Sequence, residues 1–330
     1  MHVLVTGGGG FLGRAIIDQL VARGDKVRSY ARGAYPELAA LGVEVVHGDI
    51  NDRRALAAAC SGIECVIHAA AIAGIGIDWA PYERTNLRGT ETVIASCLKQ
   101  GVARLVYTSS PSVVFNGQDQ CGIDESAPYD FAWMEAHAAH YSRSKALAEQ
   151  AVLAANGNVL RTCALRPHLI WGPRDNHLIP RLIERARRRR VVRVGDGTNK
   201  VDVTYIDNAA TAHLQAIEAL AAGTRAAGRA FFISQGAPVN CWEWINEILA
   251  LAELPPVKRS ISLKWAERLG ATCEKTHRWL HRKGEPPMTR FLAAQLAKSH
   301  WFDISAAKRV LGYKAEVTTA KGMRRLAEWL

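Results

Sequence analysis

Several features are missing from this sequence of 330 residues, and each absence argues against a class of protein. No stretch of about 18 uncharged apolar residues occurs, so we expect no membrane-spanning helix. The opening MHVLVTGGGG lacks the basic and apolar segments of a signal peptide. The seven cysteines are scattered and include no C-x-x-C pair. We therefore expect neither a disulfide framework nor a metal site, and we expect a cytoplasmic protein.

Acidic residues are also in deficit, with 31 Asp and Glu against 42 Lys and Arg, which gives a net charge of +11. A basic chain favours an anionic partner. The densest basic run is residues 185–190, followed by Arg193. We interpret it as a solvated helix end, because no nucleic-acid recognition motif accompanies it and we expect no nucleic-acid partner. An acidic carrier protein or an anionic lipid remains the alternative.

Buried-strand patterns alternate with helical patterns through the first half of the chain, which predicts a Rossmann-type, doubly wound parallel sheet of the α/β class. The pattern fades after about residue 166, although 201–206 and 230–233 read as strands that return to the sheet. We expect a dinucleotide-binding core at 1–167 and 202–235, with a smaller substrate-binding lobe at 168–201 and 236–330. The predicted strands are 2–6, 26–30, 43–46, 65–68, 104–107 and 159–165, and the predicted helices include 11–23, 53–60, 84–100 and 141–155.

A glycine-rich loop directly follows the first strand and opens the first helix. Gly7, Gly10 and Gly13 give the spacing that lets a pyrophosphate approach backbone N–H groups at a helix N-terminus. An NAD-type site places a carboxylate at the end of the second strand, but this strand ends in Arg32. A guanidinium suits a 2′-phosphate. The sequence therefore predicts NADP(H) as the preferred cofactor, with NAD(H) as the alternative.

A tyrosine and a lysine four residues apart supply the candidate catalytic pair. Tyr141 and Lys145 share one face of a predicted helix. An ammonium near a phenol favours the phenolate, so we expect Lys145 to lower the pKa of Tyr141. The fifth strand ends in Thr108, Ser109 and Ser110, where a hydroxyl could hydrogen-bond a substrate carbonyl.

With these motifs in this order, the chain resembles the extended short-chain dehydrogenases/reductases over essentially its whole length. The resemblance implies that Ser110, Tyr141 and Lys145 are catalytic, Ser110 being chosen over Ser109 from the valine that follows the motif. It also implies a contact of Asp49 with adenine. The cofactor-binding residues expected from the loop and the resemblance are Gly7, Gly10, Phe11, Leu12, Gly13, Arg32, Asp49, Ile50, Ala69, Ala70, Asn86, Tyr141, Lys145 and Pro167.

Within that superfamily the chain is most similar to the 3β-hydroxysteroid dehydrogenase-like branch, through residues 107–113, 165–173 and 312–313. More narrowly, three segments resemble the bacterial 2-alkyl-3-oxoalkanoate reductases of olefin biosynthesis. These segments are residues 199–208, 284–291 and 300–305.

The resemblance implies NADPH-dependent reduction of the ketone of a hydrophobic β-keto acid. Dehydrogenation of a 3β-hydroxysteroid or sterol carboxylate is the first alternative. A sugar-nucleotide epimerase and a non-catalytic NADP sensor are less favoured. A two-chain substrate with a carboxylate needs apolar walls and a cation. The candidate substrate contacts are Ser110, His168, Trp171, His177 and Arg290, with Trp242, Trp244 and Phe291 as further walls.

Residues 262–283 form a predicted amphipathic helix with an excess of basic residues. Such a helix can lie in a membrane interface, contact another biosynthetic enzyme, or pack as a lid on its own domain. All three interpretations remain open, so peripheral membrane association is an alternative to a purely cytoplasmic protein. The superfamily resemblance also suggests a homodimer.

Overall fold

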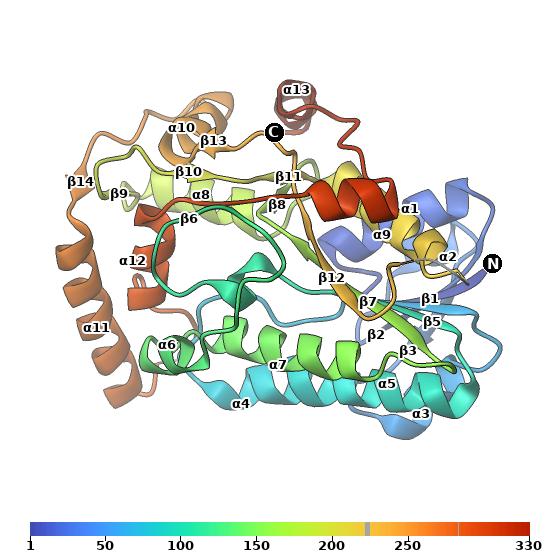
Figure 1. Ribbon diagram of the computed structural model, residues 1–330. Coiled ribbons are helices and arrows are strands. Elements are labelled where there is room, and N and C mark those ends of the chain that lie inside the picture. The colour runs from blue at the N-terminus through green and yellow to red at the C-terminus, as the bar shows by residue number, and fades with distance from the viewer. Residues whose placement is uncertain (222–224, 283) are drawn as a thin grey trace.

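The computed structural model describes residues 1–221, 225–282 and 284–330. A sheet of seven parallel strands lies at its centre, in the order β3–β2–β1–β4–β5–β7–β12 (Figure 1). This is the order of a Rossmann fold, which changes direction between β1 and β4. The predicted doubly wound α/β fold is confirmed. The strands are β1 (His2–Thr6), β2 (Lys26–Ala31), β3 (Glu44–His47), β4 (Cys65–His68), β5 (Arg104–Thr108), β7 (Arg161–Pro167) and β12 (Arg229–Ile233).

Helices cover both faces of this sheet, which explains why its central strands are apolar at nearly every position. Along β1, Val3 and Val5 join one hydrophobic cluster and Leu4 joins another, because successive side chains point to opposite faces. One face carries α1 (Phe11–Ala22) and α9 (Ile206–Ala219), and the other carries α3 (Arg53–Ala59), α5 (Gly89–Gln100) and α7 (His140–Ala154).

Short strands outside the central sheet, all but β6 from the second half of the chain, form separate small sheets. Residues 201–206, expected to return to the central sheet, do not join it. Val201 ends β10, which pairs with β13 and β15, and Thr204 and Tyr205 form β11, which pairs with β8. The expectation for 230–233 is confirmed by β12. The small-sheet strands are β6 (Gln120–Ile123), β8 (Ile170–Trp171), β9 (Arg193–Val194), β10 (Lys200–Val201), β11 (Thr204–Tyr205), β13 (Val239–Asn240), β14 (Ser260–Ile261) and β15 (His300–Phe302).

A third hydrophobic cluster, centred on Trp171, Trp242 and Trp244, fills the interior around these small sheets. None of the helices in the described ranges is long and apolar enough to cross a membrane. The remaining helices and helical turns are α2 (Pro36–Ala39), α4 (Trp79–Tyr82), η1 (Glu83–Arg88), η2 (Pro111–Val114), α6 (Phe131–Ala136), α8 (Leu178–Arg187), α10 (Cys241–Leu251), α11 (Leu263–Trp279), α12 (Arg290–Ala297), η3 (Ala307–Leu311) and α13 (Thr319–Trp329).

A buried ion pair joins α7 to the central sheet. Arg166 on β7 and Glu149 on α7 are 2% and 0% exposed, and their side chains approach to 2.6 Å. Tyr129 also donates a hydrogen bond to the same carboxylate. A charge removed from water this completely depends on its partners. The pair therefore fixes α7, which carries the candidate catalytic residues, against the sheet.

We expect Arg166→Met to lower the free energy of unfolding by about 3–5 kcal/mol, because the Glu149 carboxylate would lose its buried counter-charge. The matched control is Arg188→Ala, which removes an exposed ion pair with Glu184 and should change stability by less than about 1 kcal/mol. Urea unfolding followed by circular dichroism measures both. Equal losses in the two variants would show that the buried pair has no special role.

Candidate active site

The loop between β1 and α1 depends on glycine at two positions for different reasons. Gly7 adopts φ +74°, and a Cβ there would lie 2.9 Å from the backbone of Ala70. A Cβ at Gly13 would lie 2.2 Å from the carbonyl oxygen of Gly7. Helix α1 begins after Gly10 without a side-chain cap, so its first N–H groups remain available to an anion.

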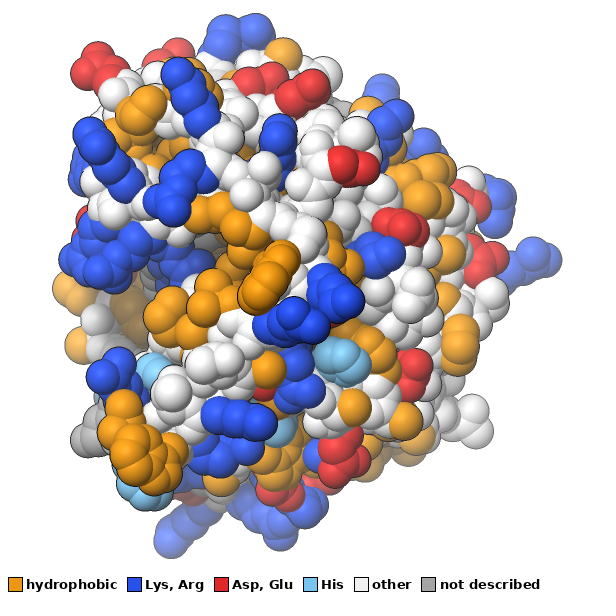
Figure 2. Space-filling model, turned by 90° about the vertical axis from the view of Figure 1, so that its left-hand side faces the viewer, with side chains coloured by type: hydrophobic (Ala, Val, Ile, Leu, Met, Phe, Trp, Pro, Cys, Tyr) orange, Lys and Arg blue, Asp and Glu red, His pale blue; other side chains and the backbone are white. Residues whose placement is uncertain are grey.

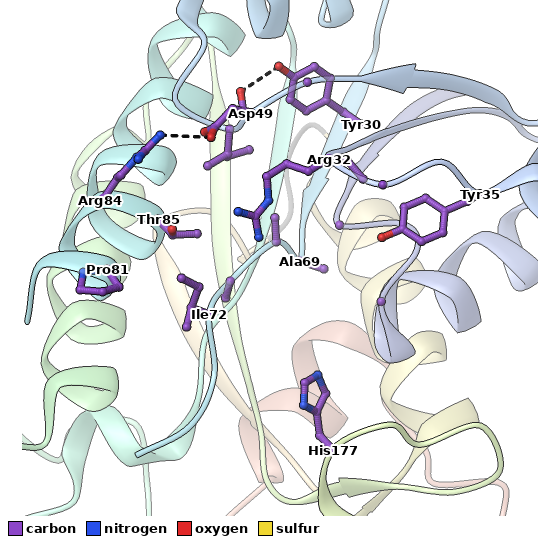
Figure 3. Close-up of a pocket in the computed structure, with 18 of the residues that line it drawn as sticks. Tyr30, Arg32, Tyr35, Asp49, Ala69, Ile72, Pro81, Arg84, Thr85 and His177 are labelled. Atoms are coloured by element: carbon purple, nitrogen blue, oxygen red, sulfur yellow. Dashed lines mark hydrogen bonds and ion pairs between the residues drawn. The ribbon is translucent and has the colours of Figure 1, made fainter. Parts of the chain in front are cut away.

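A cavity of about 1030 Å³ opens beside this loop, at the carboxyl ends of the strands (Figure 3). Its residues come from the ends of β1, β2, β3 and β4, from α4 and η1, and from His177 just before α8. A site built from a glycine cradle, a helix N-terminus and the strand ends fits a dinucleotide. The expected cofactor contacts that line this cavity are Gly7, Gly10, Arg32, Asp49, Ile50, Ala69 and Ala70.

The other expected cofactor residues lie outside this cavity lining. Phe11 borders a second cavity of about 510 Å³, which also includes Gly10. Leu12 packs against the core, and Pro167 is the buried end of β7. Asn86 is buried, and its amide bonds the N–H and carbonyl of Ile72. It therefore shapes the loop that follows β4.

Two arginines, Arg32 and Arg84, line the end of the cavity that is bounded by β2 and β3. Arg32 extends into the cavity (Figure 3) and forms no ion pair with any residue in the described ranges. Arg84 on η1 approaches the Asp49 carboxylate to 3.3 Å. Hydrogen bonds from Asn51 lower the pKa of Asp49, with a further contribution from Arg84 and Arg32. By contrast, Arg28 pairs with Glu44. Arg84 carries no sequence signal, because only the fold brings η1 opposite β3.

Ser110 and Tyr141 meet where β5 ends against α7. Ser110 begins the helical turn η2, and its hydroxyl accepts from the N–H of Ser112. The same hydroxyl lies 3.0 Å from the hydroxyl of Ser112, and Ser110 is close enough to the phenol of Tyr141 to lower its pKa. Ser109, by contrast, is 3% exposed, and its hydroxyl has no partner among the described residues. Of the two serines, the structure brings Ser110 to the tyrosine.

The expected effect of Lys145 on Tyr141 is absent. Burial raises the pKa of Tyr141 to about 12, and the smaller, opposite effect of Ser110 on this pKa does not cancel the rise. Lys145 donates to the carbonyl oxygen of Thr108 and lies 4.1 Å from the ring centre of Tyr107. Burial also lowers the pKa of Lys145 to about 7, opposed by Glu149. The phenol is therefore held in its protonated form, which is the form that donates a proton.

A small cavity next to Tyr141 is lined by Gly74, Ile75, Gly76, Ala138, Ala139, His140, Thr289 and Phe291. Phe291 is the one expected aromatic wall that lines it. His140 was not expected from the sequence. Its Nε2 bonds the carbonyl of Ile77, and its buried Nδ1 has no partner among the described residues.

The remaining expected substrate contacts have other surroundings. Trp171 is fully buried against Tyr205 and Trp244, in the third hydrophobic cluster. His168 is buried, with Nδ1 hydrogen-bonded to the carbonyl of Asp202.

Two further candidates are placed differently from the expectation. His177 lines the dinucleotide cavity, at a distance from Arg32 in Figure 3. Arg290 binds the Glu274 carboxylate through its guanidinium and its backbone N–H. The sequence could not distinguish these placements, because aromatic and cationic side chains serve a core or an internal ion pair equally well.

A carboxylate that the sequence did not single out holds three segments together near this cavity. Glu285 accepts a hydrogen bond from the N–H of Ile75 and pairs with Arg181 of α8 at 3.0 Å. A Cβ at Gly74 would lie 2.1 Å from the same carboxylate. The loop after β4, helix α8 and the segment before α12 are thus joined by one side chain.

The model of the 3-beta hydroxysteroid dehydrogenase/isomerase family matches residues 4–264. This chain belongs to that family. The resemblance to the 3β-hydroxysteroid dehydrogenase-like branch is therefore confirmed, and the protein is an NAD(P)-dependent oxidoreductase of the short-chain dehydrogenase/reductase type.

Two curated relatives are named 2-alkyl-3-oxoalkanoate reductase. The one from Stenotrophomonas maltophilia is 49% identical and covers 99% of this chain and 98% of its own length. The one from Shewanella oneidensis is 46% identical and covers 98% and 85%. Among solved structures, UDP-glucuronic acid 4-epimerase from Bacillus cereus in complex with NAD superposes with a TM-score of 0.75 at 20% identity, over 100% of this chain and 98% of its own. This last likeness concerns the fold alone.

We expect Gly13→Ala to weaken dinucleotide binding at least about tenfold and to lower the melting temperature, because the new methyl group would displace the Gly7 carbonyl. Gly157→Ala is the matched control, since a Cβ there meets nothing within 4 Å. Titration with NADPH followed by fluorescence measures the affinity. An unchanged dissociation constant in Gly13→Ala would contradict the tight approach of α1 to the loop.

Proposed function

We propose that this protein uses NADPH to reduce the ketone of a 2-alkyl-3-oxoalkanoate, giving the 2-alkyl-3-hydroxyalkanoate. The main support is a cavity built for a dinucleotide at the carboxyl ends of the strands, in a chain that also places Ser110 close to Tyr141 at the end of β5. The substrate class comes from the two relatives that share nearly half of their residues with this chain over most of its length.

In the proposed mechanism, the residues at the end of β5 and on α7 orient the ketone and supply the proton. The bound dinucleotide supplies the hydride that the carbonyl carbon accepts. Ser110 donates a hydrogen bond to the carbonyl oxygen, which stabilises the negative charge that develops there. Tyr141 then transfers its phenolic proton to that oxygen. The raised pKa of Tyr141 suits this step, because an alkoxide is a far stronger base than a phenolate.

Lys145 acts as a positioning residue in this proposal. Its ammonium is held by the Thr108 carbonyl at the end of β5, and the family resemblance gives it a contact with the nicotinamide ribose. Asn86 supports the same region, since its amide also donates to the Ser144 hydroxyl one residue before the lysine.

NADP(H) is the proposed preferred cofactor. The Arg32 guanidinium lies in the cavity without a carboxylate partner in the described ranges, and Arg84 stands nearby on η1. A 2′-phosphate would supply the missing negative charge. A carboxylate suited to a ribose 2′-hydroxyl is absent from the end of β2.

The lobe formed by residues 168–201 and 236–330 is proposed to hold the alkyl chains. Thr289 and Phe291 support this, because both line the small cavity next to Tyr141. Oxidation of a 3β-hydroxysteroid is the second candidate, since the family that matches this chain carries that name. Both reactions use the same serine, tyrosine and lysine.

The test of the proposed function compares three reactions under one set of conditions. They are reduction of a short 2-alkyl-3-oxoalkanoate with NADPH, the same reduction with NADH, and reduction of NADP⁺ with a 3β-hydroxysteroid. Absorbance at the nicotinamide band reports turnover. Turnover of the β-keto acid with NADPH preferred supports the proposal, whereas turnover of the steroid alone would move the assignment to the second candidate.

We expect Tyr141→Phe to lower kcat by about 10²–10⁴, because the proton donor is lost, while NADPH binding stays within about threefold. Tyr313→Phe is the control. Its hydroxyl bonds the carbonyl of Ser234 and its side chain lines none of the cavities described above, so kcat should remain within about twofold. Retained turnover in Tyr141→Phe would refute the assigned proton donor.

Arg32→Ala should raise KM for NADPH by about 10–100-fold and leave KM for NADH nearly unchanged, because the guanidinium is proposed to bind only the 2′-phosphate. Steady-state kinetics with each cofactor measure the ratio. Arg28→Ala provides the comparison, since Arg28 is engaged with Glu44 and with the carbonyl of Ala59. A parallel rise in both constants for Arg32→Ala would argue against NADP(H) selection by this residue.

A further inference from the structure

Helix α11 (Leu263–Trp279) exposes large apolar side chains that the rest of the structure leaves uncovered. Trp265 is 63% exposed, Leu269 49% and Trp279 79%, and Leu280 at the end of the helix is 46% exposed. These are four of the ten large hydrophobic side chains exposed in the described part of the chain. The two tryptophans are separated by about 21 Å along the helix axis, at 1.5 Å per residue.

The exposed half of α11 is divided into two strips. At about 100° per residue, Trp265, Leu269 and Trp279 fall on one strip, together with two threonines. The neighbouring strip carries positive charge, and the Arg268 guanidinium lies 5.1 Å from the ring centre of Trp265. Its basic residues, all exposed, are Lys264, Arg268, Lys275 and Arg278.

No exposed carboxylate offsets this charge within α11, which is described throughout. The helix contains two acidic residues. Glu274 is buried and binds Arg290 of α12, and Glu267 is half-buried. Arg282, just beyond the helix, is exposed and adds a further positive charge. Lys283, the last residue of the segment expected to be amphipathic, lies outside the described residues.

The opposite face of α11 explains why the exposed strips point outward. Ala266, Gly270 and His277 are buried, and a Cβ at Gly270 would lie 2.6 Å from the backbone of Thr289. This close packing on α12 fixes the helix at one side of the molecule (Figure 1). Figure 2 shows that side, on which blue side chains border orange ones.

The same contact ties α11 to the catalytic cavity. Thr289, against which Gly270 packs, lines the small cavity next to Tyr141, as does Phe291 of α12. The segment that leads from α11 to α12 carries Glu285, which binds the loop after β4. Helix α11 therefore presents its strips to the outside and packs, on its other face, against residues that line the small cavity next to Tyr141.

We propose that the exposed face of α11 docks on an anionic lipid surface. A strip of tryptophan and leucine beside a strip of lysine and arginine, on a helix too polar to cross a bilayer, has the composition of a helix that lies in the membrane interface. Tryptophan is favoured at that depth because its ring is apolar and its N–H is polar.

The charge alone does not single out α11, and the basic run on α8 makes this clear. Residues 185–190 carry five arginines. However, no large hydrophobic side chain of α8 is among those exposed in the described ranges. The run at α8 can attract anions but has nothing to insert, whereas α11 combines attraction with apolar area.

Docking through α11 would place the small cavity next to Tyr141 close to the lipid surface. If the proposed function holds, a β-keto acid with two alkyl chains would reach Tyr141 from the membrane rather than from water. Docking itself does not depend on the reaction, so it can be tested without any turnover measurement.

Vesicle flotation tests the proposal with the full chain. The probes are vesicles of phosphatidylcholine alone and vesicles of phosphatidylcholine with about 30% phosphatidylglycerol. We expect flotation with the anionic vesicles, weaker flotation with the neutral ones, and release by 0.5 M salt. We expect the Trp265→Ala, Trp279→Ala double variant to lower the partition coefficient at least about tenfold. The Lys264→Gln, Arg268→Gln, Lys275→Gln triple variant should lower it by about a hundredfold.

The matched control is Arg187→Gln, Arg188→Gln, Arg189→Gln, which removes the same charge from the α8 region and should retain most of the binding. Melting temperatures check that each variant is folded. Failure of the wild-type protein to float with anionic vesicles refutes the proposal, as does an equal loss in the α8 control. Size-exclusion chromatography provides a separate refutation: a dimer that the α11 tryptophan variant converts to a monomer would show that a second copy covers this face.

Discussion

The close approach of α1 to the first strand loop is the constraint on which the rest of the site depends. A Cβ at Gly13 would overlap the Gly7 carbonyl, and a Cβ at Gly7 would press on Ala70 after β4. These contacts bring the N-terminus of α1, the end of β1 and the end of β4 to one point. The cavity exists because three backbone segments meet there without side chains between them.

Burial, rather than an attractive charge, governs the protonation of Tyr141 and Lys145, the candidate catalytic pair. Burial raises the pKa of the Tyr141 phenol and lowers that of the Lys145 ammonium, and it does so because water is excluded from both. The lysine finds its main partner in the Thr108 carbonyl. Tyr141 therefore stays protonated, which suits the proton-donor role proposed for it in the reduction of a ketone.

The sequence predicts the parts of this protein that rest on local patterns. The glycine spacing, the alternating strands and helices, and the four-residue spacing of Tyr141 and Lys145 are all short-range features. Their positions in the fold follow from the parallel sheet, because its strand ends share one edge. The choice of Ser110 over Ser109 stays a prediction, and the burial of the Ser109 hydroxyl without a partner among the described residues favours it.

The second half was less predictable, because its contacts join segments distant in the chain. Trp171 could line a pocket or a core, and only its packing against Trp244 places it in the core. The sequence allows Arg290 to bind a substrate carboxylate. In the structure its guanidinium is instead engaged by the carboxylate of Glu274, sixteen residues earlier in the chain. The strand expected at 201–206 was apolar enough for the central sheet, yet its two short pieces pair with neighbours in the second half.

The Glu285 contacts have a consequence for redesign of this enzyme. Any side chain at position 74 would meet the Glu285 carboxylate, and movement of that carboxylate would also release Arg181 and the Ile75 N–H. A side chain introduced at position 74 would thus disturb helix α8 and the segment before α12 as well as its own loop. Redesign of the loop after β4 has to include residues 181 and 285.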